Sequence, residues 1–154
     1  MYTQAAICKN GHVATANASS YTDSFCKECG SEIIKSCPNC GESIQGNYYE
    51  EFFWTCGSYV PPLYCHNCGQ PYPWTTARIE AAKMLIEDMD ELSDEEKKKM
   101  SESIDKIITD TPYTEASANR IKKYLLKIGR ESASAIRDIL VNIASESAKK
   151  YFGL

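Results

Sequence analysis

Three copies of one short cysteine motif lie within residues 26–69, and they constrain the fold of this chain more than any other feature. Each copy reads Cys-x-x-Cys-Gly, a tight turn from which two thiolates can reach one zinc ion about 2.3 Å away. A fourth, looser half-site precedes them as Cys8-Lys-Asn-Gly-His12. Together the four half-sites offer enough ligands for two closed tetrahedral zinc sites. The expected ligands are Cys8, His12, Cys26, Cys29, Cys37, Cys40, Cys65 and Cys68.

The spacing leaves two ways of pairing the half-sites. In sequential pairing, the first two half-sites share one zinc ion and the last two share the other. A cross-brace would join the first half-site to the third and the second to the fourth. Loops of 13 and 24 residues between sequential partners favour sequential pairing, because they suit two zinc ribbons in tandem. An ordinary surface role for His12 is the competing interpretation, which would leave a three-cysteine site with a water ligand.

The composition changes sharply at about residue 75. All eight cysteines, both histidines and both tryptophans lie in residues 1–75 and none lies in residues 76–154. The sequence therefore predicts an α+β protein. Residues 1–75 should form a small double zinc-ribbon domain of short β-strands and zinc knuckles, and residues 76–154 a helical domain of three to four helices.

Apolar periodicity and end signals predict the helices of the second half. Thr75 is expected to cap the first helix, and a capping box beginning at Ser93 should start the second. Thr111-Pro112 is expected to start the third. The last helix should run without a break from about Ser132 to Phe152, with Tyr151 facing inward.

Charge and targeting signals narrow the function classes. The formal net charge is −4, and residues 1–75 hold three lysines against six acidic residues. This balance opposes a phosphate-binding surface. The first residues do not read as a signal peptide, and no apolar stretch approaches the roughly 20 residues of a membrane span. We therefore expect a cytoplasmic protein without a membrane partner, whose cysteines bind metal rather than form disulfides.

Catalytic signals are weak. A structural zinc site has four protein ligands, whereas a catalytic site keeps one position open, and by count both sites here are closed. The sequence has no Gly-rich phosphate loop, His-Glu-x-x-His helix or nucleophile elbow. Cys56 is left over, and its neighbours favour a small apolar residue over a reactive thiol. The prediction is a protein that is not an enzyme, with no catalytic residues and no cofactor beyond two structural zinc ions.

An aromatic segment separates the third half-site from the fourth. Because five aromatic residues fall within residues 48–54, strand alternation cannot bury all of them on one face. Exposed aromatic groups suit a protein partner, whereas the competing interpretation is that they form the apolar mass of a small ribbon core. The candidate recognition residues are Tyr48, Tyr49, Phe52, Phe53 and Trp54.

The motifs taken together resemble an uncharacterised bacterial family. The resemblance is carried by Ile7-Cys-x-Asn-Gly-His12, Phe25-Cys-x-x-Cys-Gly30, Cys37-Pro-x-Cys40 and Tyr64-Cys-x-x-Cys-Gly-x-Pro-Tyr-Pro-Trp-Thr75. Members of that family pair an N-terminal double zinc ribbon with a helical C-terminal region. The resemblance implies the ligand set above, with His12 in a motif position, and it implies no activity.

These features favour a non-enzymatic zinc-ribbon protein that acts as a protein-interaction or adaptor module. The partner is expected to be another protein. The alternative is a zinc-ribbon protein that binds nucleic acid in a regulatory role, which rests on analogy between zinc ribbons alone.

Overall fold

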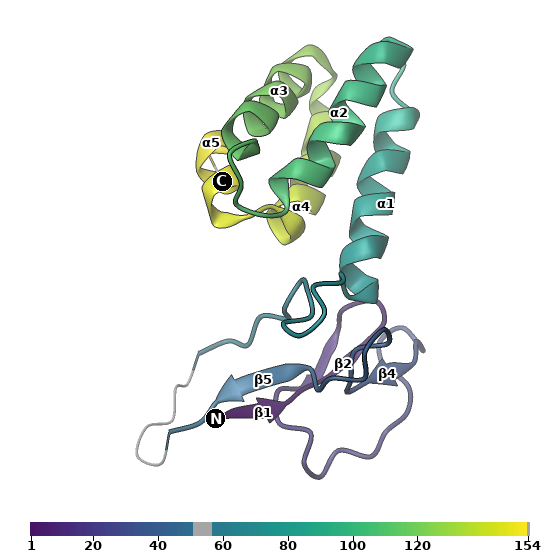
Figure 1. Cartoon of the computed structure of the whole chain (residues 1–154). Helices are drawn as coiled ribbons and strands as arrows, with labels where there is room; N and C mark the ends of the chain where they lie inside the picture. The colour runs from purple at the N-terminus through teal and green to yellow at the C-terminus, as the bar shows by residue number, and fades with distance from the viewer. Residues whose placement is uncertain (51–56, 154) are drawn as a thin grey trace. The chain divides into compact units, whose positions relative to one another are not determined.

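A computed structural model describes residues 1–50 and 57–153, in which short strands precede five helices (Figure 1). This arrangement confirms the predicted α+β class. The chain divides into two compact units, Met1–Ala77 and Arg78–Leu154. The division falls two residues beyond the change in composition.

The first unit contains two small antiparallel sheets (Figure 1). Strand β1 (Tyr2–Gln4) pairs with β5 (Gln45–Tyr48). Strand β2 (Ala6–Cys8) is the centre of the other sheet, between β3 (Val13–Thr15) and β4 (Ile33–Ile34). Strand β2 therefore ends on the first of the expected metal ligands.

The ribbon core is small and partly aromatic. The rings of Tyr72 and Trp74 are stacked, with centroids 4.7 Å apart. Both side chains are almost fully buried, and Nε1 of Trp74 donates to the carbonyl oxygen of Pro62 at 2.9 Å. The aromatic mass at these two positions thus belongs to the core. The buried cluster comprises Ala5, Ile7, Cys37, Ile44, Cys65, Tyr72 and Trp74.

Strand β5 makes a close backbone approach at Gly46. A Cβ atom built at this position would lie 1.9 Å from the carbonyl oxygen of Ala16 and 2.5 Å from Oγ1 of Thr3. The next amide, that of Asn47, donates to the same Ala16 oxygen at 3.3 Å. Only glycine leaves room for this contact, which holds residues 16–18 beside the β1–β5 sheet.

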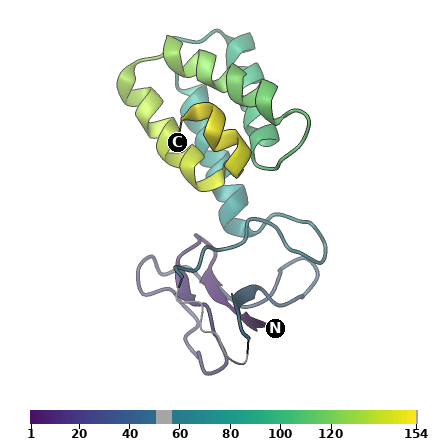
Figure 2. The same ribbon diagram turned by 90° about the vertical axis from the view of Figure 1, so that its left-hand side faces the viewer.

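Five helices follow, rather than the three to four predicted. They are α1 (Pro73–Glu87), α2 (Asp94–Ile107), α3 (Thr114–Lys127), α4 (Arg130–Ile143) and α5 (Glu146–Phe152). Helix α3 packs against both α2 and α5 (Figure 2). None of the helices within residues 1–50 and 57–153 has the length and apolar character needed to span a membrane.

The second unit has its own hydrophobic core, to which all five helices contribute. The buried faces of α2 and α3 both lie in this core. The buried residues are Ala82, Ile86, Met89, Leu92, Met100, Ile104, Ile107, Ala118, Ile121, Tyr124, Leu125, Ile128, Ala133, Ile136, Leu140, Ile143, Ala144 and Ala148.

The prediction of one unbroken last helix was wrong. Ala144 has an extended backbone (φ −69°, ψ 144°), which ends α4. The Ser145 hydroxyl then accepts a hydrogen bond from the Ala148 amide at 3.2 Å and caps a new helix. As a consequence Tyr151 is 37% exposed rather than inward, and Phe152 packs against the core instead.

Two helix starts also differ from the prediction, and one is confirmed. Helix α1 begins at Pro73, so Thr75 lies inside its first turn rather than before it. The Thr75 hydroxyl does not cap the helix, since it donates to the carbonyl oxygen of Leu63 at 2.8 Å. Helix α3 begins at Thr114, two residues after the predicted Thr111-Pro112 start. The capping box of α2 is present, with the amide of Glu96 donating to the Ser93 hydroxyl at 3.2 Å.

Candidate metal centres

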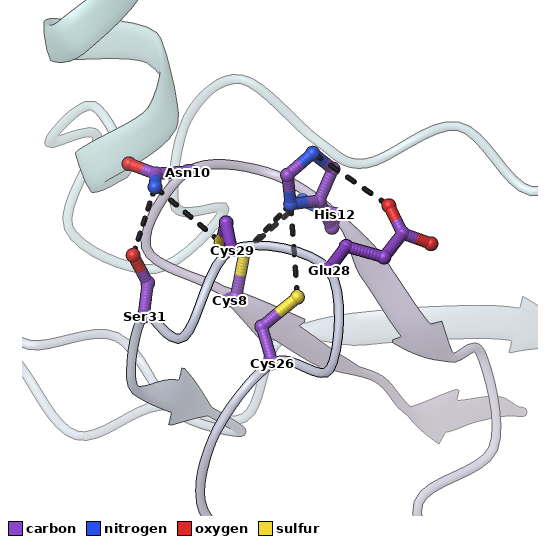
Figure 3. A network of polar contacts seen from close by, with 7 residues as sticks. All are labelled: Cys8, Asn10, His12, Cys26, Glu28, Cys29 and Ser31. Atoms are coloured by element: carbon purple, nitrogen blue, oxygen red, sulfur yellow. Dashed lines mark hydrogen bonds and ion pairs between the residues drawn. The ribbon is translucent and has the colours of Figure 1, made fainter.

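The first group of ligands combines the end of β2 with a knuckle between β3 and β4 (Figure 3). Sγ of Cys8 lies 3.5 Å from Nδ1 of His12 and 3.7 Å from Sγ of Cys29. Sγ of Cys26 lies 3.7 Å from the same imidazole nitrogen. His12 therefore faces three thiols, as a fourth metal ligand must.

The second group is formed by two Cys-x-x-Cys knuckles facing each other. Sγ of Cys37 lies 3.7 Å from Sγ of Cys68, and Sγ of Cys40 lies 3.7 Å from Sγ of Cys65. Each separation joins one knuckle to the other, so the second knuckle completes the site that the first begins.

These separations match the edges of a zinc-centred tetrahedron. Zn–S bonds of about 2.3 Å place two thiolates about 3.8 Å apart, and a Zn–N bond of about 2.0–2.1 Å places sulfur and nitrogen about 3.6 Å apart. Within each group all four ligand atoms lie within 4.8 Å of one another. Both groups are thus compatible with two structural zinc ions. Zinc held by four protein ligands would stabilise the fold and offer no open coordination position.

The grouping is sequential along the chain. Cys8 and His12 meet the half-site that begins at Cys26, and the half-site at Cys37 meets the one at Cys65. The cross-brace alternative is therefore wrong.

Positive-φ glycines close the three Cys-x-x-Cys knuckles. Gly30, Gly41 and Gly69 have φ angles of +71°, +79° and +72°. The amide of each donates to the carbonyl oxygen of the first cysteine of its knuckle at 2.8–2.9 Å. A residue with a Cβ would be strained at this φ, so the glycine allows the chain to turn back immediately after the second thiol.

Backbone amides aimed at sulfur favour the thiolate form at several ligands. A hydrogen bond from the backbone of Ser31 is the main cause that lowers the pKa of Cys29 to about 5. A backbone hydrogen bond from Cys68 is the main cause that lowers the pKa of Cys65 to about 6. Burial acts in the opposite direction at Cys37, where it raises the pKa to about 11. The lowered pKa values of Cys29 and Cys65 favour the thiolate form that binds metal. Cys37 would need the positive charge of an ion beside it to lose its proton.

Three of the half-sites have asparagine as their third residue, and these side chains add hydrogen bonds around the ligand thiols. Nδ2 of Asn10 donates to Sγ of Cys29 at 3.5 Å, and Nδ2 of Asn67 donates to Sγ of Cys40 at 3.6 Å. In each case the asparagine of one half-site reaches a thiol of the opposing half-site. These donors would hold the thiolates in place around a metal ion.

The same arrangement recurs at Cys68. The backbone of Gln70 is the first cause of its lowered pKa, and a hydrogen bond from the Asn39 side chain is the second. Asn39 is again the third residue of the opposing half-site. The second centre is therefore supported from both sides by equivalent asparagines.

The remaining half-site, Cys26-Lys-Glu-Cys29, carries glutamate in this position. Oε2 of Glu28 lies 3.8 Å from Nε2 of His12, on the side of the imidazole that faces away from the thiols (Figure 3). None of these four residues around the ligands was predicted from the sequence. They are Asn10, Glu28, Asn39 and Asn67. Their shared position in Cys-x-Asn and Cys-x-Glu was the signal that could have indicated them.

The candidate recognition residues are only partly described. Tyr48 is 48% exposed and Tyr49 is 43% exposed. The Tyr48 ring meets that of Tyr2 edge to face across the β1–β5 pair, with centroids 5.0 Å apart. Phe52, Phe53 and Trp54, like the unassigned Cys56, lie outside the described residues.

Two closed sets of nitrogen and sulfur ligands among short antiparallel strands define a double zinc ribbon, here followed by a helical region. The chain belongs to the bacterial family described as an uncharacterised protein conserved in bacteria (DUF2321), whose profile matches residues 1–152. No curated protein and no solved structure matches it.

Proposed function

We propose that this protein is a non-enzymatic zinc-ribbon adaptor, which recognises another protein through aromatic side chains of the β1–β5 sheet. The observation that carries the proposal is the exposed edge-to-face pair of Tyr2 and Tyr48. Their relative exposures are 54% and 48%, so both rings remain available to a partner.

The metal centres support a structural role. Four protein ligands surround each expected ion, so neither ion would have a position for a substrate or a reactive water. The ligands would instead stabilise a scaffold that presents its surface residues.

Charge supports a protein partner rather than nucleic acid. Residues 1–75 already carry a formal charge of −3, from three lysines and six acidic residues. Three thiolates around one divalent ion add −1 and four thiolates around the other add −2, so a zinc-loaded ribbon carries −6. Phosphate backbones are repelled by such a charge.

The surface around the tyrosine pair has the anatomy of a binding site. A shallow cavity of about 340 Å³ lies beside it. Its lining combines apolar and aromatic groups with polar side chains, the residue types that form the centre and rim of interface hot spots. The lining residues are Met1, Tyr2, Thr3, Gln4, Asn17, Ser19 and Tyr49.

The experiment compares affinity purifications from the native host, with the intact zinc-loaded chain as bait. The double substitution Tyr2→Ser and Tyr48→Ser should abolish capture of a specific protein while leaving zinc content and melting temperature close to the parent. Val60→Ser is the matched control, because Val60 is 77% exposed and does not line the cavity. Identical capture by all three baits would refute the recognition surface. Salt-sensitive retention on DNA or heparin would favour the nucleic-acid alternative.

A further inference from the structure

We propose that a groove between α3 and α4 binds an acidic amphipathic helix of a partner protein. This proposal concerns the helical unit and does not depend on the tyrosine surface. The groove has a volume of about 710 Å³ and is lined by the last turn of α3 and by α4 as far as Val141. The residues that carry the argument are Leu126, Arg130, Ala133, Ser134, Arg137 and Val141.

The shape of the groove suits a helix. Leu126 is 75% exposed and Val141 is 44% exposed, although both are apolar. Ser134 lies between them in sequence, is exposed and has a small side chain, so a partner helix can approach the α4 backbone closely. The groove therefore offers exposed apolar side chains from both α3 and α4.

The length of the groove can be judged from α4. Its lining residues include positions 130, 134, 137 and 141, which follow one stripe along the helix. At a rise of about 1.5 Å per residue this stripe extends about 16 Å, or three turns. A partner helix of about three turns, with apolar residues at i, i+3 or i+4 and i+7, has the matching pattern.

The charges of the groove select an acidic partner. Arg130 and Arg137 lie two turns apart on the stripe, and neither forms an ion pair within residues 1–50 and 57–153. Asp138 is the one acidic residue of the lining. Glutamates beside the apolar stripe of a partner would therefore find unpaired guanidinium groups.

A second copy of this chain is the competing occupant. Two copies docked through the same groove would oppose two patches of net positive charge, each with two arginines and one aspartate, because a two-fold interface places the same patch on both sides. Like charges opposed across an interface disfavour association. The charge pattern thus favours a different protein.

The test is a selection from a display library of random 16-residue peptides against the full-length, zinc-loaded protein. We expect enriched peptides to carry apolar residues at helical spacing with glutamate or aspartate beside them, and to become helical on binding by circular dichroism. Enrichment of basic or non-helical peptides, or no enrichment, would overturn the proposal.

Three single variants then locate the binding site. Arg137→Glu and Leu126→Ser should each weaken peptide binding at least about tenfold in fluorescence anisotropy, since they remove a charge partner and an apolar anchor. Arg120→Glu, an exposed charge reversal on α3 outside the groove lining, should leave binding unchanged. Equal binding by all variants would refute the site. A concentration-dependent dimer in sedimentation that Val141→Glu abolishes would assign the groove to a second copy and also overturn the proposal.

Discussion

Nε2 of His12 lies 3.8 Å from Oε2 of Glu28, while Nδ1 of the same ring faces the thiols of the first centre. A carboxylate on the outer nitrogen fixes the orientation and tautomer of a histidine ligand and strengthens its binding to metal. Glu28→Ala should therefore lower the zinc affinity of the first centre about tenfold, the lower end of the range for such residues, because Glu28 is exposed to solvent.

Competition with a chromophoric chelator measures this effect. Glu32→Ala is the control, since Glu32 is a similarly exposed acid that pairs with Lys9 rather than with a ligand. A loss of affinity in the control as large as that in Glu28→Ala would show that general charge, and not the histidine contact, is responsible.

Gly46→Ala should destabilise the ribbon by about 2–3 kcal/mol, because the new methyl group would overlap the Ala16 carbonyl oxygen. Gly57→Ala is the matched control, since no atom of the described residues lies within 4 Å of a Cβ built at that position. Urea unfolding followed by tryptophan fluorescence reports on the ribbon, because both tryptophans lie in residues 1–75. Equal stability of the two variants would contradict the close approach of Gly46 to Ala16.

Acid should loosen the ribbon before it affects the helices. The pKa of Cys29 is about 5 and that of Cys65 about 6, both below the ordinary thiol value of 9.0. A lowered folded-state pKa stabilises the fold fully above pH 9, and that stabilisation shrinks as the pH falls and is lost through about pH 6 and 5. Protons also compete with zinc for the same thiolates, which acts in the same direction.

The pH effect can be read from two signals in one sample. Between pH 8 and pH 5.5, the urea midpoint from tryptophan fluorescence should fall, and the midpoint from circular dichroism at 222 nm should change less, because residues 76–154 contain no cysteine. A fluorescence midpoint independent of pH would contradict the prediction.

Local motifs explain how much of this structure the sequence could predict. A Cys-x-x-Cys-Gly turn is determined within five residues, so the knuckles could be predicted, and the loop lengths favoured the sequential grouping that the structure shows. The capping box at Ser93 is equally local and was predicted correctly. Apolar periodicity located the helical core for the same reason.

Features that depend on contacts between distant segments were missed. Thr75 has the sequence of a helix cap, but its hydroxyl donates to Leu63, and that contact exists only in the folded ribbon. Apolar periodicity continues across Ser145 and hid the break between α4 and α5, where the Ser145 amide donates to the carbonyl oxygen of Ile107 at 2.9 Å. The role of Asn67 was invisible because its partner, Cys40, belongs to a half-site 27 residues away.

Zinc removal should melt the ribbon and leave most of the helical signal. The two hydrophobic clusters share no residue, and the helical cluster contains none of the expected ligands. A strong chelator should therefore change tryptophan fluorescence greatly and ellipticity at 222 nm only slightly. Loss of nearly all ellipticity would show that the helices depend on the ribbon for their stability.

Native mass spectrometry of the intact protein and of Cys40→Ser tests the double zinc ribbon most directly. We expect two zinc ions per chain for the parent. Substitution of Cys40 removes one ligand of the second centre alone, so the variant should retain one tightly held ion at the first centre. One ion or none in the parent would contradict the double zinc ribbon on which every other conclusion about the N-terminal unit depends.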